Sequence, residues 1–173
     1  MTIDTLNQVF STYEVLKDSI KVTRRSINKS IGNLHTNTVF FAEQNDIIIK
    51  KISSVEEELD DIMILSLFAS FERELRVSIQ FTIDLSVQRV NPVINKFIEL
   101  TSESIERWTM KDIIDAFDGF VNENNRGIVK QIYEYRNWVA HGKNPDKLPS
   151  IKTDTKTVFM NLCDFISQAS RAL

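Results

Sequence analysis

The chain of 173 residues contains few residues of the types that end helices, cross-link a fold or cross a membrane. Its four glycines and three prolines supply too little turn chemistry for a many-stranded sandwich. The one cysteine, Cys163, cannot form an internal disulfide, and its apolar neighbours predict a core residue in a reducing compartment. No apolar run approaches the length of a membrane span, and residues 1–5 lack the features of a signal peptide. We therefore expect a cytoplasmic protein with no membrane contact.

The charge of the chain is close to balanced, with 21 Lys and Arg against 24 Asp and Glu and a net charge of −3. Such a balance argues against non-specific coating of nucleic acid, so any RNA contact must come from a local patch. The hydrophobic fraction of 42% and the charged fraction of 26% are typical of a globular protein with one well-filled core. We expect one domain over residues 1–173.

Apolar residues recur at helical spacing through most of the sequence, which predicts an all-α bundle with two long helices and several shorter ones. The first long helix is expected from Asp4 to about Leu34. A stripe of basic residues runs along its other side: Lys17, Lys21, Arg24, Arg25 and Lys29. This stripe is either a solvated face or a contact for a phosphate backbone, with Lys21 and Arg25 as the candidate ligands.

The second long helix is expected to begin at Ser53 and Ser54, which open two overlapping Ser-x-x-Glu capping boxes. The acidic run at 56–61 suits a helix N-terminus, and the apolar residues 62–75 predict passage through the middle of the domain. Residues 75–87 alternate strictly between apolar and polar, as a strand does. A helix is still favoured, because thirteen residues is long for a strand and no second alternating run exists to pair with it.

Shorter helices are expected after Pro92, over about 93–100, and after the cap formed by Thr109 and Asp112. Residues 122–127 predict a polar turn, 142–153 a loop, and the apolar residues of 158–169 a closing helix.

The segment 133–142 carries the candidate chemistry. Its apolar spacing predicts an amphipathic helix ending at Gly142, which places His141 at the helix end. Asn137 shares a face with His141, whereas Arg136 lies about 140° away around an ideal helix. If the last turn loosens, Arg136 can swing toward the imidazole. A permanent cation, an amide and a titratable base would then lie in one small volume. Such a set of groups is suited to binding a phosphodiester and acting on it.

Two features near this segment keep alternative interpretations open. Glu72 lies among apolar residues, so it is expected to pair either with Arg136 when buried or with Arg76 on an exposed strip. His141 and Gly142 can instead be only a helix cap, with Arg136 paired to Glu134 or Glu72. Tyr135 and Trp138 can stack on bases or serve as core or dimer-interface residues.

The segment 136–141, Arg-Asn-Trp-Val-Ala-His, resembles the RxxxxH motif of the HEPN superfamily of helical bundle domains. Residues 68–76 are similar to the Phe-Glu-containing core helix of its bacterial members. The resemblance implies a metal-independent endoribonuclease without a cofactor, often found in toxin-antitoxin or phage-defence systems. It also implies a homodimer with one composite cleft and an antitoxin or other defence protein as a possible partner.

The same resemblance implies roles for individual residues. His141 would be the general acid or base, Arg136 would bind the scissile phosphate and Asn137 would orient the site. Cleavage would leave a 2′,3′-cyclic phosphate and a 5′-hydroxyl. Glu72, Lys143, Lys21 and Arg25 are the candidates for substrate binding or support. The alternative is a non-catalytic HEPN-like module that binds a nucleotide or a partner protein.

Overall fold

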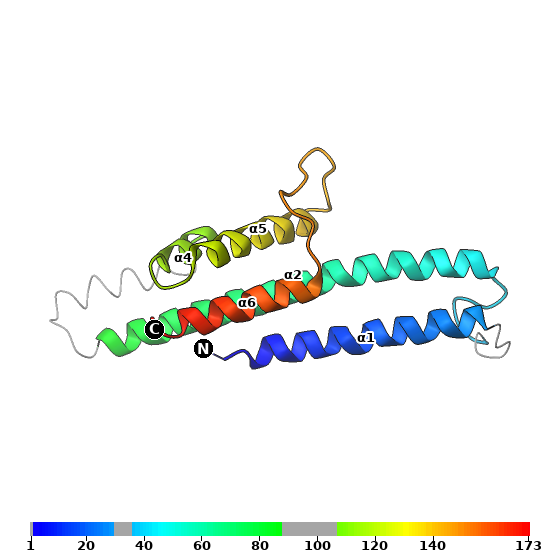
Figure 1. Ribbon diagram of the computed structural model, residues 1–173, viewed down its shortest axis with the longest axis horizontal. Coiled ribbons are helices and arrows are strands. Elements are labelled where there is room, and N and C mark those ends of the chain that lie inside the picture. The colour runs from blue at the N-terminus through cyan, green and yellow to red at the C-terminus, as the bar shows by residue number, and fades with distance from the viewer. Residues whose placement is uncertain (1, 30–35, 88–106) are drawn as a thin grey trace.

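The computed structural model describes residues 2–29, 36–87 and 107–173, which form an all-α bundle with no strand in these ranges (Figure 1). The helices are α1 (Asp4–Asn28), α2 (Asn45–Val87), α4 (Met110–Ala116), α5 (Glu123–Ala140) and α6 (Thr155–Ala169). The predicted fold class, with two long helices and several shorter ones, is confirmed. No helix in the described ranges combines the length and apolarity that a membrane crossing requires.

Helix α2 forms the centre of the bundle, as the apolar run 62–75 predicts. Phe68, Phe71 and Leu75 are fully buried, and α1, α5 and α6 all pack against α2. Beyond Leu75, Ile79 still packs on the core, whereas Val77, Phe81 and Leu85 are exposed. Positions 75 and 79, which contact the core, are four residues apart, as expected for one face of a helix. The alternation of apolar and polar residues in 75–87 therefore does not make this segment a strand.

The predicted start of α2 at Ser53 is wrong, because the helix begins at Asn45. Ile48 and Ile52 pack against Ile27 of α1 and form a second, small core. This part of the α1 and α2 pair extends beyond the ends of α5 and α6 (Figure 1). The burial of these isoleucines against α1 continues the helix through the Ser-x-x-Glu signals, because tertiary packing outweighs local capping.

The helix cap that was predicted before α4 forms as expected. Thr109 forms the predicted capping box with Asp112: the Asp112 amide donates to Thr109 Oγ1 at 3.2 Å, and the Thr109 amide donates to Asp112 Oδ2 at 3.1 Å. The polar turn predicted at 122–127 is wrong, because five of these six residues lie inside α5. Asn122 already caps α5, and Gly127 lies inside the helix.

Some expectations fall outside the described residues. Helix α1 is described to its end at Asn28, with Lys29 as its C-cap. The remainder of the predicted first helix, to Leu34, and the short helix expected over 93–100 lie outside the described ranges.

Candidate functional site

The C-terminal end of α5 holds His141 in a defined position. The Gly142 amide donates to the carbonyl of Val139 at 3.0 Å, and the Lys143 amide donates to the carbonyl of Trp138 at 2.9 Å. These are the two hydrogen bonds of a Schellman motif, and Gly142 supplies the left-handed residue with φ +81°. The predicted cap at Gly142 is confirmed, and His141 is the exposed C-cap residue.

A direct contact between Arg136 and His141 would need a loosened last turn of α5, but this turn is regular. The His141 amide donates to the carbonyl of Asn137 at 3.0 Å, which is a regular helical bond. The long side chain of Arg136 instead turns to its neighbour, and its Nη1 donates to Asn137 Oδ1 at 2.9 Å. Asn137 therefore connects the guanidinium to the face that carries His141.

Arg136 differs from the other partly buried arginines of the described chain in having no carboxylate partner. Arg24 pairs with Glu56, Arg76 with Glu72, and Arg126 with Asp115 and Asp118. Arg136 forms no ion pair with any described residue, and its buried Nε has no hydrogen-bond partner there. Its positive charge is thus not neutralised by a neighbouring side chain.

The expected partners of Arg136 are engaged elsewhere. Glu72 pairs with Arg76 at 2.8 Å, one turn along α2, which is the second of the two partners considered for it. Arg76 also donates to the carbonyl of Trp108 at 2.9 Å, which fixes the pair against the segment before α4. Glu134 pairs with Lys111 at 2.8 Å. Neither carboxylate is close enough to neutralise Arg136, so the purely structural explanation of this arginine as an ion-pair partner fails.

A shallow hollow of about 340 Å³ opens beside the end of α5. Its lining brings together an imidazole, amides, an indole, an ammonium and one carboxylate: His141, Asn137, Asn144, Trp138, Lys147 and Glu134. The indole is fixed by a hydrogen bond from Trp138 Nε1 to the carbonyl of Asn144 at 2.8 Å. The hollow therefore offers an exposed base next to amides, with the guanidinium of Arg136 bonded to one of them.

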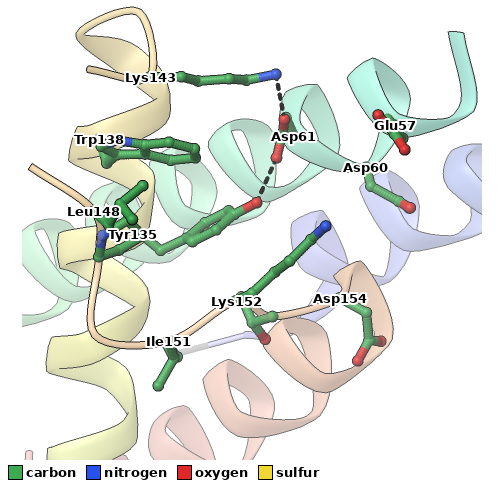
Figure 2. A pocket seen from close by; sticks show the side chains of 12 residues that line it. Glu57, Asp60, Asp61, Tyr135, Trp138, Lys143, Leu148, Ile151, Lys152 and Asp154 are labelled. Carbon is green, nitrogen blue, oxygen red and sulfur yellow. Dashed lines mark hydrogen bonds and ion pairs between the residues drawn. The ribbon is translucent and has the colours of Figure 1, made fainter. Parts of the chain in front are cut away.

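Lys143 does not face this hollow as a free cation. Its Nζ lies 2.6 Å from Asp61 Oδ2 (Figure 2). It also lies 2.8 Å from Glu58 Oε1, and both carboxylates are on α2. Hydrogen bonds to these carboxylates raise the pKa of the Lys143 ammonium. The side chain therefore ties the end of α5 to α2, and its expected role in substrate binding or support stays a prediction.

Asp61 also accepts a hydrogen bond from the hydroxyl of Tyr135 at 2.7 Å. Burial of the phenol, assisted by that bond, raises the pKa of Tyr135 above its usual range. Tyr135 and Asp61 are both almost fully buried. The acidic run of 56–61 is therefore a mid-helix set of partners for cations and hydroxyls, not the helix N-terminus predicted from the sequence.

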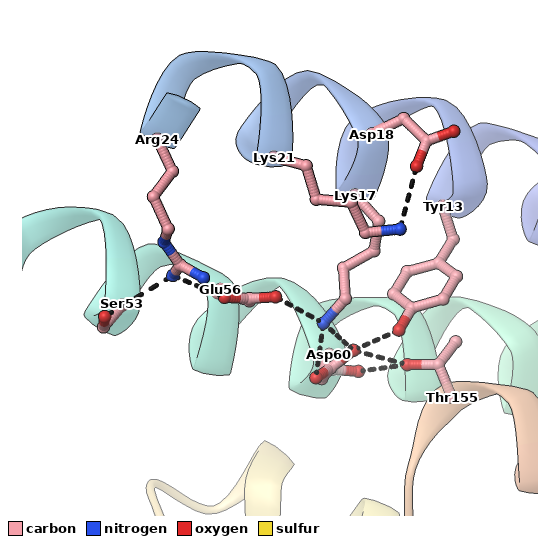
Figure 3. A network of polar contacts seen from close by, with 9 residues as sticks. All are labelled: Tyr13, Lys17, Asp18, Lys21, Arg24, Ser53, Glu56, Asp60 and Thr155. Atoms are coloured by element: carbon pink, nitrogen blue, oxygen red, sulfur yellow. Dashed lines mark hydrogen bonds and ion pairs between the residues drawn. The ribbon is translucent and has the colours of Figure 1, made fainter. Parts of the chain in front are cut away.

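The basic stripe of α1 separates into residues with different partners (Figure 3). Lys17 Nζ lies 3.1 Å from Glu56 and 3.2 Å from Asp60, and Arg24 lies 2.7 Å from Glu56, so these two cations join α1 to α2. Lys21 pairs within α1, at 2.9 Å from Asp18, and Arg25 is exposed. No described contact links Lys21 or Arg25 to the end of α5.

A larger hollow of about 520 Å³ lies between α2, the end of α5 and the segment leading into α6 (Figure 2). Trp138 lines both this hollow and the one beside His141. The sequence analysis did not identify it, because its walls come from segments far apart in the chain. The adjacent aromatics at 135 and 138 were its only local signal.

Comparison with known proteins adds no family assignment: no family model, curated protein or solved structure matches the chain. The candidate site therefore consists of Arg136, Asn137 and His141 and of the two hollows that share Trp138.

Proposed function

We propose that the chain is a metal-independent endoribonuclease of the HEPN type, acting through Arg136, Asn137 and His141. The observation that carries the proposal is the partly buried Arg136, which forms no ion pair with any described carboxylate and donates to Asn137 beside the exposed His141. A structural arginine in a fold is normally neutralised, as Arg24, Arg76 and Arg126 are here. An arginine left with its charge next to a proton-exchanging side chain is suited to an anionic substrate.

The chemistry needs only side chains of this site. Arg136 binds the non-bridging oxygens of the scissile phosphate and stabilises the charge that grows on them. A histidine base removes the proton of the ribose 2′-hydroxyl, whose oxygen forms a new bond to phosphorus. The bond from phosphorus to the 5′-oxygen breaks, and a histidine acid protonates that leaving oxygen. The products are a 2′,3′-cyclic phosphate and a 5′-hydroxyl.

A homodimer supplies the second imidazole that this scheme uses. One His141 cannot be both the base that takes the first proton and the acid that gives the second in the same step. Two copies related by a two-fold axis present the same surface to each other and bring two sets of residues into one cleft. The uncommitted charge of Arg136 and the exposure of His141 fit a site completed by a second copy. An antitoxin or another phage-defence protein that covers this end of α5 would control it.

The test is cleavage of a labelled single-stranded RNA by the purified protein in EDTA, with analysis of the product ends. We expect cyclic-phosphate ends from the wild type and none from His141→Ala. Arg136→Lys should also lose most activity, because an ammonium cannot replace the two-pronged guanidinium. The matched control is Arg171→Lys, at an exposed arginine without a described ion pair and outside the candidate site, which should keep full activity. Circular dichroism of each variant verifies folding.

The composite site has its own test. Wild type is mixed with increasing amounts of His141→Ala and refolded, so that wild-type copies enter mixed dimers that hold a single imidazole. If the cleft needs both imidazoles, activity falls with the square of the wild-type fraction, which supports a shared cleft. A fall in direct proportion to the wild-type fraction shows that each copy works alone. RNA binding without cleavage by any form supports the non-catalytic binding module instead.

A further inference from the structure

The larger hollow has the size and lining of a site for a small organic ligand. It holds about 520 Å³, and its walls are the aromatic side chains of Tyr135 and Trp138 and the apolar residues Leu148, Pro149 and Ile151 (Figure 2). Ligand sites of this volume are typically apolar with a few placed polar groups. The indole of Trp138 is held by its hydrogen bond to the Asn144 carbonyl, so it offers a fixed flat surface.

Most of the polar groups in the lining are already committed. Asp60 accepts from Tyr13 at 2.7 Å and from Thr155 at 3.1 Å and pairs with Lys17 (Figure 3). Asp61 is shared between Tyr135 and Lys143.

Asp154, also in the lining, caps α6 through the amide and hydroxyl of Thr157, at 3.0 Å and 2.6 Å. Two lining side chains of opposite charge have no partner among the described residues: Glu57 and Lys152.

Both side chains are exposed and can turn toward a molecule in the hollow, and together they favour one class of ligand. An anion would meet the carboxylates of α2, and a simple cation would meet the ammonium groups of Lys143 and Lys152. A neutral flat ring with both donors and acceptors can donate hydrogen bonds to the Glu57 carboxylate and accept one from the Lys152 ammonium. Guanine has this pattern: N1–H and N2–H are adjacent donors for a carboxylate, and O6 is an acceptor for an ammonium. Adenine, cytosine and uracil lack two adjacent ring-edge donors next to an acceptor.

We propose that this hollow binds a guanine base, which lies against Trp138, donates to Glu57 and accepts from Lys152. The further step, that the base belongs to the RNA being cut, rests on the proposed ribonuclease function. Trp138 lines both hollows and His141 lines the smaller one, so a base on one side of the indole places its neighbouring phosphate toward His141. Cleavage is then directed to sites next to guanosine.

Isothermal titration calorimetry with nucleosides tests the base site without any cleavage. Guanosine should bind to the wild type at least about tenfold more tightly than adenosine, and 1-methylguanosine, which lacks the N1–H donor, should lose about tenfold. Glu57→Gln should weaken guanosine binding by a similar factor. The matched control is Glu14→Gln, at an exposed glutamate on α1 outside the hollow, which should bind guanosine as the wild type does. No guanosine binding, or equal binding of guanosine and adenosine, overturns the guanine site.

Cleavage of an RNA with a single guanosine separates the two proposals. Cutting next to that guanosine, lost in Glu57→Gln while cutting elsewhere continues, supports the guanine site as part of the ribonuclease. Guanosine binding with no RNA cleavage leaves the guanine site standing as a site for a free guanine nucleoside and overturns the proposed enzyme. Cleavage with no preference for guanosine and no guanosine binding overturns the guanine site and keeps the enzyme.

Discussion

The hydrogen bond from Tyr135 to Asp61 should contribute measurably to stability, because it joins α5 to α2 through two side chains that are almost fully buried. The hydroxyl lies 2.7 Å from Asp61 Oδ1, and the two residues are only 5% and 8% exposed. Hydrogen bonds to charged groups contribute about 1.5–3 kcal/mol. Tyr135→Phe keeps the ring and its packing, and Asp61 keeps Lys143 as a partner. We therefore expect a loss near the lower end, about 1.5–2 kcal/mol in the free energy of unfolding.

Urea unfolding followed by circular dichroism measures this loss. The matched control is Tyr133→Phe on the same helix, because Tyr133 stacks on Phe68 with ring centroids 5.5 Å apart and its hydroxyl has no described hydrogen bond. The control should change stability by less than about 0.5 kcal/mol. A double-mutant cycle of Tyr135→Phe with Asp61→Ala should show coupling well above about 0.5 kcal/mol. Additive effects, or equal losses at 133 and 135, would refute the argument.

Three further predictions follow from single contacts. Gly142→Ala should cost about 1–2 kcal/mol in a thermal or urea melt, because φ is +81° and an added Cβ meets no neighbouring atom, so the cost comes from the backbone alone. The hydrogen bond from Lys17 is the main cause that lowers the pKa of Glu56, so this stabilisation is present above the unfolded pKa of about 4.3 and is lost as the pH falls through the folded value. Glu56→Gln should accordingly show a smaller drop in melting temperature than the wild type between about pH 5 and pH 3. Burial raises the pKa of the Cys163 thiol, so a thiol reagent at about pH 8 should react more slowly with the native protein than with the urea-unfolded chain.

Structural features that depend only on residues close together in the chain could be predicted from the sequence. The capping box at Thr109 and Asp112 and the Schellman end at Gly142 each depend on neighbouring residues, and both form as predicted. The helical structure of 75–87 was also predictable, because no partner strand exists in the sequence for its alternating pattern to pair with. These features need no knowledge of what packs against them.

Contacts between distant segments were not readable in the same way. The start of α2 is set by the packing of Ile48 and Ile52 on Ile27 of α1, which no capping signal reveals. Lys143 was a candidate for substrate binding or support beside the motif, and the sequence did not reveal its partner Glu58, which is 85 residues earlier in the chain. A positive residue near a candidate site can be assigned to substrate only after its possible carboxylate partners have been placed in space.

The end of α5 holds Arg136 and His141 in fixed positions relative to each other. The regular helix up to Ala140 keeps Arg136 and His141 on different sides, and the bond from Arg136 to Asn137 is the link between them. Within one copy the Arg136 guanidinium therefore contacts the Asn137 amide, which lies on the same face as His141, and does not contact the imidazole directly. Since the helix end is fixed by Gly142 and by the tether from Lys143 to α2, this arrangement does not depend on a flexible last turn. In the proposed ribonuclease, a substrate phosphate would therefore have to bridge Arg136 and His141 of one copy, or of two copies, for both groups to act on one bond.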